Sequence, residues 1–515
     1  MKVLLLGSLA VLIFARIWRK PGELALFALI LGCSLPLFNQ SGTFAIGQKH
    51  SSLRLEYLLP FMGLLVLASS QSRAVPRAAS RLNRVVGFAF LLHVASILRD
   101  LLYGNPPGLG ISLRLLESFG CFFLFSRLTQ ATDIPALVNG YIGIGVALSA
   151  VCATIALSGS LNLYRFFFEY GAAGKSGRDF AYQYEYKGTA LPRVWSGTAD
   201  EFIYLAAVMS FVLALGARRG RMFYSACALA ILLRLATSGT RSLVLAAVFG
   251  CGLGWLISTR NTGIRPIRSA RVIVPLGIVL ALLVAVTCVP RLSVYAGMMV
   301  QRFGETGQGL ASDSQTMGAK LAWTALNNAG LRGWLLGVGW DAELGDKGYD
   351  INTPILGIYR FGVVGLMVLL ALAFQVARVA LALVRTQNLD AHECAIVAAV
   401  LTYSLVSVLG SGFRGFGLAE NFMRLGGFVV LLSWLEVVYQ ERACRQRGPV
   451  RSALEPFRSR RIPPLPLRAL SQPATRPGLP KRGRLQWVPA RARGLPTGGA
   501  LTGGRYAPWA RRSTP

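Results

Sequence analysis

Long apolar runs follow one another through most of this chain, and they constrain its fold more than any other feature. A membrane-spanning helix needs about 20 predominantly apolar residues, and fewer where cations at its ends reach the interface. Of the 515 residues, 53% are hydrophobic and only 15% are charged, which excludes an ordinary soluble domain. The sequence therefore predicts an all-α, polytopic membrane helix bundle of about 12–13 transmembrane helices. The candidate spans are 3–17, 24–38, 55–70, 85–102, 111–127, 135–157, 201–217, 222–238, 241–258, 272–289, 354–383, 392–411 and 421–439.

The Lys and Arg residues lie mainly in short loops between these runs and after the last one. Cytoplasmic loops carry an excess of Lys and Arg, so such loops indicate orientation. Alternating through the runs puts three Arg-bearing loops, 73–84, 218–221 and 260–271, on the cytoplasmic side. The formal charge of +32 is thus explained by membrane topology, and we expect no nucleic acid as a partner.

The same alternation leaves two long loops, Gly159–Asp200 and Arg291–Thr353, on the outer side, each with nearly balanced charge. Loops of this length are usually functional or disordered. The chain after residue 440 is rich in Arg, Pro and Gly, and we expect a disordered, cytoplasmic tail, either dispensable or attracted to anionic membrane lipids. The predicted regions are transmembrane helices in 1–158, 201–290 and 354–440, extracytoplasmic loops in 159–200 and 291–353, and the basic tail in 441–515.

Eight cysteines lie in or beside apolar runs or in the tail, and no two share an outer loop. We therefore expect neither disulfides nor a cysteine metal site. The outer loops contain no Asp-x-Asp pair or cluster of metal ligands. The sequence predicts no metal requirement and no cofactor.

The junction Leu235–Ser242, with the sequence Leu-Ala-Thr-Ser-Gly-Thr-Arg-Ser, is the first stretch that could carry chemistry. An Arg here is costly in hydrocarbon unless it faces water, an anion or a partner. Arg241, with Arg234 about two turns before it, could hold a phosphate together with the N–H groups that begin the next helix. The hydroxyls that would assist are Thr237, Ser238 and Thr240. Alternatively, Arg241 only extends to the interface and binds no ligand.

A second stretch, Arg193–Glu201, leads into the span that begins near residue 201. Trp195 is suited to anchoring at the bilayer boundary. Asp200 and Glu201 are suited to capping the helix, which is the simpler interpretation. The functional alternative is a carboxylate that binds an acceptor or takes its proton.

A third stretch, Ser312–Leu366, is polar and Gly-rich between two apolar blocks. The spacing of Ala319–Asn327 predicts a helix lying on the membrane surface, with Trp323 on its apolar face. Leu336–Trp340 then predicts a flexible turn, because its glycines permit conformations that other residues resist. Asn352 precedes the next span at Pro354.

The order of these stretches, followed by Gly362–Leu366, resembles the O-antigen ligase/polymerase superfamily over about residues 190–370. The resemblance implies a GT-C-like fold in the bacterial inner (cytoplasmic) membrane and a glycosyltransferase that polymerises polyprenyl-pyrophosphate-linked oligosaccharides. The product would be O-antigen, capsule or exopolysaccharide, and a chain-length regulator is a further implied partner. The alternatives are an O-antigen ligase, which transfers finished polymer to lipid A-core or protein, and a transporter or flippase of lipid-linked sugars. We find no internal repeat of the kind common in transporters.

Two departures from the family pattern weaken the ligase assignment more than the polymerase assignment. Ile351-Asn352 stands where ligases carry His-Asn, and the three histidines, His50, His93 and His392, lie elsewhere. No Arg directly precedes the Trp-containing helix, so Lys320 and Arg302 are the nearest cations.

The resemblance also implies roles for single residues. Fixed cations must meet the charge that develops on a leaving pyrophosphate, and Arg241 is the first choice, then Arg302 or Lys320, then Arg234. An acceptor hydroxyl needs a base. The candidate bases are Asp313, Asp341 and Glu201, and the further candidates for substrate binding are Asn352, Arg193 and Trp323.

Overall fold

The structure is a computed structural model, and the part that it describes lies within one compact unit, Met1–Pro449. A second unit, Val450–Pro515, lies outside the described residues. The described residues are 2–32, 42–46, 49–53, 59–69, 80–102, 109–160, 163, 183–186, 189–192, 198–217, 219–238, 241–261, 270–304, 314–339, 354–386, 388–409 and 427–447.

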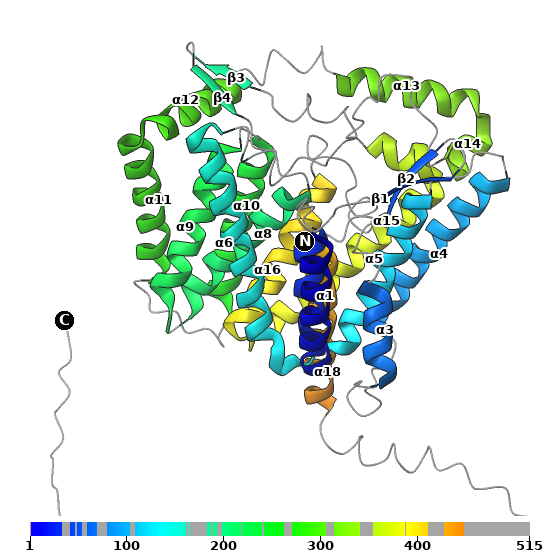
Figure 1. The fold of residues 1–515 in the computed structure, drawn as a ribbon, viewed down its shortest axis with the longest axis horizontal. Helices are drawn as coiled ribbons and strands as arrows, with labels where there is room; N and C mark the ends of the chain where they lie inside the picture. Colours follow the sequence, from blue (N-terminus) through cyan, green and yellow to red (C-terminus); the bar gives the residue numbers. More distant parts are fainter. Residues whose placement is uncertain are drawn as a thin grey trace, which may run out of the picture. The chain divides into compact units, whose positions relative to one another are not determined.

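A helix coincides with each of the predicted apolar runs, so the helix bundle is confirmed (Figure 1). These helices are α1 (Lys2–Arg19), α2 (Leu24–Gly32), α3 (Leu59–Ser69), α4 (Arg81–Leu102), α5 (Leu109–Leu128), α6 (Ile134–Ser158), α8 (Thr198–Gly216), α9 (Arg221–Thr237), α10 (Arg241–Arg260), α11 (Ala270–Cys288), α15 (Pro354–Arg385), α16 (Ala391–Leu409) and α18 (Gly427–Arg447). Between them lie the short helices η1 (Pro21–Glu23), η3 (Ala131–Asp133), α12 (Pro290–Gly304), α13 (Ser314–Asn328) and α14 (Gly330–Leu336).

The apolar helices make this a multi-pass membrane protein. Within the described residues, four segments are long and apolar enough to cross a bilayer: Arg81–Leu102, Ala131–Ser158, Leu243–Arg260 and Arg271–Cys288. A fifth is added if Ile358–Val368 and Leu370–Arg385, bent by 41°, form one span. The expected 12–13 spans also include shorter apolar helices, so that number stays a prediction.

Two short antiparallel hairpins were not predicted. One pairs β1 (Gly42–Ile46) with β2 (Lys49–Leu53), and the other pairs β3 (Gln183–Tyr186) with β4 (Thr189–Pro192). The β3–β4 hairpin belongs to the first predicted outer loop, and α12 and α13 belong to the second. Figure 1 shows these elements at one end of the bundle, which we call the loop end.

Helix α8 forms the centre of the bundle. Its residues from Phe202 to Leu215 are all buried, and it packs against α6, α9, α10 and α16. Small residues permit this close approach, as in other membrane bundles. A Cβ added to Gly145 would lie 2.6 Å from the Ala206 Cβ, and one added to Gly250 would lie 2.5 Å from Val208 Cγ2.

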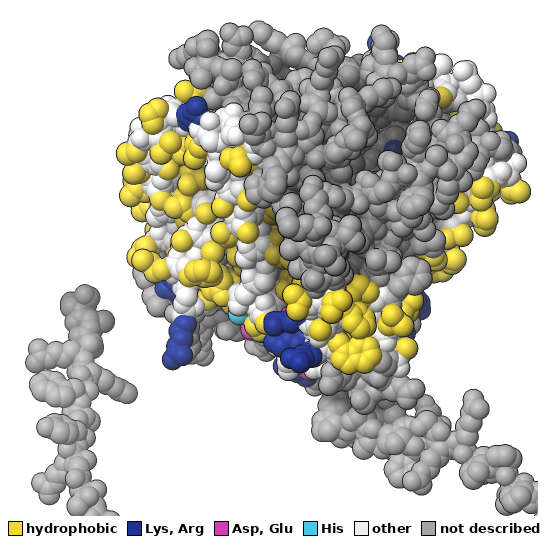
Figure 2. All heavy atoms as spheres, viewed as in Figure 1, with side chains coloured by type: hydrophobic (Ala, Val, Ile, Leu, Met, Phe, Trp, Pro, Cys, Tyr) yellow, Lys and Arg dark blue, Asp and Glu magenta, His cyan; other side chains and the backbone are white. Residues whose placement is uncertain are grey.

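The opposite end of the bundle, where α1 and α18 end and α9 begins, is called the basic end. Figure 2 shows hydrophobic side chains over the flank of the bundle and Lys and Arg side chains gathered below them. Here α18 continues to Arg447, past residue 440 where we expected the tail to begin. The helix is held by Arg442, which donates through Nε to Glu393 Oε1 at 3.2 Å and also pairs through Nη2 with Oε2. The predicted tail boundary is therefore too early.

Candidate functional site

Arg234 lies in the last turn of α9, close to the loop end, and its side chain is 0% exposed. Charged side chains inside a membrane bundle are costly, and they commonly mark substrate or ion sites. Our sequence ranking placed Arg234 last among the candidate cations. In the structure Arg234 is the candidate cation whose side chain is described and buried, whereas Lys320 is exposed. The ranking did not anticipate this burial, because burial depends on the helices that pack around a residue, which the local sequence does not show.

Tyr295 of α12 is one of the residues that the sequence analysis missed, and its phenol lies within electrostatic range of this arginine. Its side chain is 1% exposed, and burial raises the pKa of its phenol to about 12, although the charges of Arg234 and Arg291 act in the opposite direction. Tyr295 is therefore protonated at neutral pH and can donate a hydrogen bond. The available signal was the spacing of Leu292, Tyr295 and Met299, which marks the apolar face of a short amphipathic helix.

Arg291 ties the start of α12 to the end of α6. Its Nη1 donates to the carbonyl of Leu157, in the last turn of α6. The last carbonyls of a helix lack partners within it, and a cation at this end also interacts favourably with the helix dipole. Helices α6, α9 and α12 thus meet at the loop end, around Arg234 and Tyr295.

The Thr-Ser-Gly-Thr-Arg junction differs from the predicted phosphate cradle. Thr237 Oγ1 donates to the Arg234 carbonyl at 2.8 Å, and Ser238 Oγ donates to the Leu235 carbonyl at 2.7 Å. Both hydroxyl protons are thus donated to carbonyls within the end of α9. The expectation that these two hydroxyls donate to a bound phosphate is therefore corrected. Arg241 is the first residue of α10, whose leading N–H groups have no partner within the helix. The side chain of Arg241 lies outside the described part of the chain.

A helix, α13, forms where the spacing of Ala319–Asn327 predicted one, and its place on the membrane surface stays a prediction. Ala322 and Leu326 are buried against Tyr359, whereas Lys320 is exposed and Trp323 is 50% exposed. The Trp323 ring packs edge-on against the Trp334 ring, with centroids 4.9 Å apart. Helix α13 packs on α14 and α15, and α12 packs on α9, α10 and α11. The structure therefore does not bring Lys320 or Trp323 to Arg234.

Two glycine segments noted separately in the sequence are joined in the structure. Gly337 ends α14 with φ +81°, and Gly362 interrupts α15 with φ +69°. A Cβ on Gly362 would lie 2.1 Å from the Leu335 carbonyl oxygen, so only glycine fits. The N–H of Val338 also donates to the carbonyl of Tyr359 at 2.6 Å. The predicted flexible turn is thus a close backbone crossing.

Arg99 and Asp100, at the end of α4, hold this crossing together, and the sequence analysis missed them as well. The Arg99 Nε donates to Asp100 Oδ1 at 2.9 Å. Its Nη1 donates to the carbonyls of Leu336 and, at 3.2 Å, Gly337, and its Nη2 donates to the Arg360 carbonyl at 3.3 Å. The available signal was an Arg-Asp pair inside an apolar run, which is costly in a bilayer unless it is paired.

The remaining candidates fall partly or wholly outside the description. Asp313, Asp341, Asn352 and Arg193 lie outside the described residues. Glu201 lies in the first turn of α8 and Arg302 near the end of α12, and for both only the backbone is described. Among the described side chains, no three His, Cys, Asp or Glu residues are grouped as a metal site requires.

Comparison with protein-family models and with curated proteins finds no match to this sequence.

Proposed function

We propose that this protein is a glycosyltransferase that polymerises polyprenyl-pyrophosphate-linked oligosaccharide repeat units at the outer face of the bacterial inner membrane. One observation carries the proposal: a fully buried arginine, Arg234, lies at the loop end, within electrostatic range of the buried phenol of Tyr295. The start of α10 at Arg241 follows a few residues later. The order of sequence motifs over residues 190–370 supplies the identity of the substrate.

The chemistry of the reaction requires such a site. The acceptor hydroxyl attacks the anomeric carbon of the donor sugar, and the bond from that carbon to the phosphate oxygen breaks. The oxygen leaves with the electron pair, so negative charge grows on the pyrophosphate. Donors fixed in advance in a low-dielectric site stabilise this charge, and we assign this role to Arg234, Arg241 and Tyr295. The hydroxyl proton passes to a carboxylate, for which Glu201, Asp313 and Asp341 remain the candidates.

The distribution of charge supports the orientation. Groups of Lys and Arg side chains lie at the basic end in Figure 2, and cytoplasmic loops are enriched in these residues. We therefore place the basic end in the cytoplasm and the loop end at the outer face. A lipid-linked donor that has been flipped across the membrane would then approach Arg234 and Arg241 from the outer face, near which both residues lie.

The test is polymerisation by membranes that contain Arg234→Ala or Arg241→Ala, supplied with lipid-linked repeat units. We expect each change to lower the rate by about 10²–10³, the typical effect of losing one such donor. Arg234→Lys keeps the charge but loses the planar fork, so a smaller loss is expected. Arg332→Ala, which removes an exposed cation of α14 at the same end, is the matched control. Normal chain lengths in both Ala variants, at equal protein levels, would remove the cations from the mechanism.

A deletion strain separates the polymerase from a ligase. Loss of a polymerase leaves single repeats on the carrier lipid, whereas loss of a ligase leaves long polymer there. One observation favours a transporter as a second candidate: α15 is discontinuous, with a non-helical Gly362 and a 41° bend, and broken helices are common in transporters. Purified protein that moves lipid-linked sugars across vesicles without extending them would establish that alternative.

A further inference from the structure

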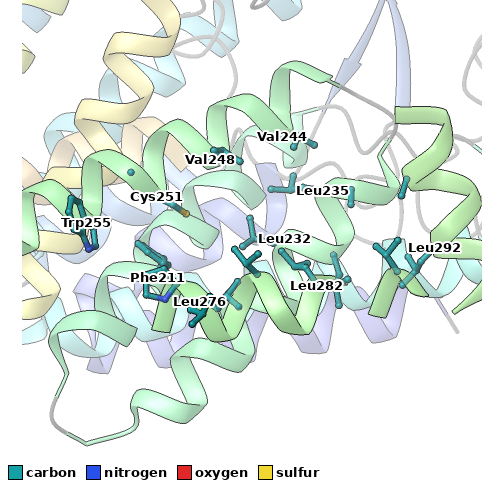
Figure 3. Close-up of a pocket in the computed structure, with 18 of the residues that line it drawn as sticks. Phe211, Leu232, Leu235, Val244, Val248, Cys251, Trp255, Leu276, Leu282 and Leu292 are labelled. Atoms are coloured by element: carbon teal, nitrogen blue, oxygen red, sulfur yellow. The ribbon is translucent and has the colours of Figure 1, made fainter. Parts of the chain in front are cut away.

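A long apolar groove of about 770 Å³ runs between α9, α10 and α11 and ends under α12. Its volume lies within the range of about 300–1,000 Å³ typical of ligand pockets. Figure 3 shows Trp255 at one end and Leu292 at the other, with Leu232, Leu276 and Leu282 between them. Several lining side chains are also widely exposed, among them Val248 at 61% and Leu276 at 64%, so the groove opens toward the surrounding bilayer.

The length of the groove argues against an ordinary phospholipid. Along α11 its lining extends from Arg271 to Val286, which at about 1.5 Å per residue is roughly 22 Å. One leaflet of the hydrocarbon core is about 15 Å thick, half of the usual 30 Å. A phospholipid acyl chain is confined to one leaflet, whereas a long isoprenoid chain can continue into the second. The groove matches the longer chain.

The two ends of the groove differ chemically. Among the described lining residues, Arg271 alone is charged, and it lies at the basic end, where its carbonyl accepts a hydrogen bond from Trp255 Nε1 at 3.3 Å. At the loop end the lining includes Tyr295, whose phenol is within electrostatic range of Arg234 and Arg291. A phosphate at the head of the chain would thus lie near the field of Arg234 and Arg291 at the loop end, and its tail would meet apolar side chains as far as Trp255 and Arg271.

We infer that this groove holds a single polyisoprenoid chain, with its phosphate at the Tyr295 end and its tail directed toward Trp255. The inference rests on the proposed function for the headgroup and deepens it, because it makes the length of the lipid chain a determinant of binding. Polyprenyl phosphates that reach past one leaflet bind the whole groove, and shorter ones leave the basic-end half empty.

Two glycines give a matched pair of variants. A Cβ on Gly252 of α10, which lines the groove, would meet nothing within 4 Å, so Gly252→Phe fills the space without a backbone clash. Gly277 of α11 also has nothing within 4 Å, but it is outside the lining, so Gly277→Phe adds the same side chain elsewhere. Nearby Gly250 and Gly254 pack against α8 and are unsuitable for this purpose.

The experiment measures retention of undecaprenyl phosphate, farnesyl phosphate and phosphatidylglycerol by the purified full-length protein in detergent, using native mass spectrometry. We expect undecaprenyl phosphate to be retained at least tenfold better than the other two, Gly252→Phe to remove that advantage, and Gly277→Phe to keep it. Equal retention of the long and short isoprenoids, or equal behaviour of the two Phe variants, would overturn the inference. Preferential retention by a protein that polymerises nothing would refute the proposed function and leave the groove assignment intact.

Discussion

Gly337 and Arg360 meet backbone to backbone: a Cβ on Gly337 would lie 2.5 Å from the carbonyl oxygen of Arg360. Because Gly337 also has a φ of +81°, Gly337→Ala combines backbone strain with a clash. We expect it to lower stability by about 2–5 kcal/mol, the sum of typical costs for left-handed strain and overpacking. Gly330→Ala is the control, since Gly330 has φ +62° but nothing within 4 Å. Thermal unfolding in detergent should show the smaller loss for Gly330→Ala, and equal losses would refute the crossing.

The Arg99–Asp100 pair should behave as a unit. The two side chains are only 12% and 4% exposed, and their charged atoms approach to 2.7 Å. Arg99→Met removes the cation and the donors to three carbonyls, so we expect destabilisation of about 3–5 kcal/mol, as for other broken buried pairs. Arg99→Met combined with Asp100→Asn should recover part of that loss, because the buried negative charge is gone. A double variant less stable than the single one would show that the pair is not the source of the effect.

Glycines on two faces of α10 should respond differently to the same substitution. A Cβ on Gly250 would lie 2.5 Å from Val208 Cγ2 and 2.6 Å from Thr402 Cγ2. Gly250→Val should therefore separate α10 from α8 and α16 and cost about 1–3 kcal/mol. Gly252→Val carries the same change in helix propensity into open space and serves as the reference. Chemical denaturation of both variants in detergent measures the difference in their free energies of unfolding. Equal values would show that α10 does not pack closely on α8 and α16 at Gly250.

Tyr295 predicts a specific alkaline transition. The pKa of its phenol is raised to about 12 from an ordinary value near 10, so the folded state favours the neutral form. The resulting stabilisation is fully present below pH 10 and is lost as the pH rises toward about 12. Spectrophotometric titration of the wild type against Tyr295→Phe should isolate one phenol with this high midpoint. A difference curve centred near pH 10 would place Tyr295 in water.

The helices that coincide with the apolar runs could be predicted, because a spanning helix in a bilayer needs little more than sufficient length and apolar side chains. Helix α12 could not, since its apolar residues lie on one face only, and Pro290–Gly304 looks like the start of a polar loop. The β1–β2 and β3–β4 hairpins were missed because pairing of such short strands depends on their surroundings.

The candidate site was predicted only in part. The sequence identified Arg234 as a candidate but ranked it low, because its burial depends on the helices that pack around α9, several of them distant in the sequence. Thr237 and Ser238 were assigned to a ligand, yet each hydroxyl finds a carbonyl three residues back, a local alternative open to any Ser or Thr in a helix. Arg99 contacts residues some 240 to 260 positions away, and no local pattern contains that information.

The position of α8 has a consequence for biosynthesis. Its partner α16 begins at Ala391, which is 175 residues after Gly216 at the end of α8. At about 5–20 residues per second, the ribosome needs roughly 9–35 s to produce that partner. During this interval one side of the most enclosed helix has only lipid or an insertion factor to cover it. The packing around α8 is thus completed late in synthesis, and we expect membrane quality control to clear nascent chains that stop before α16.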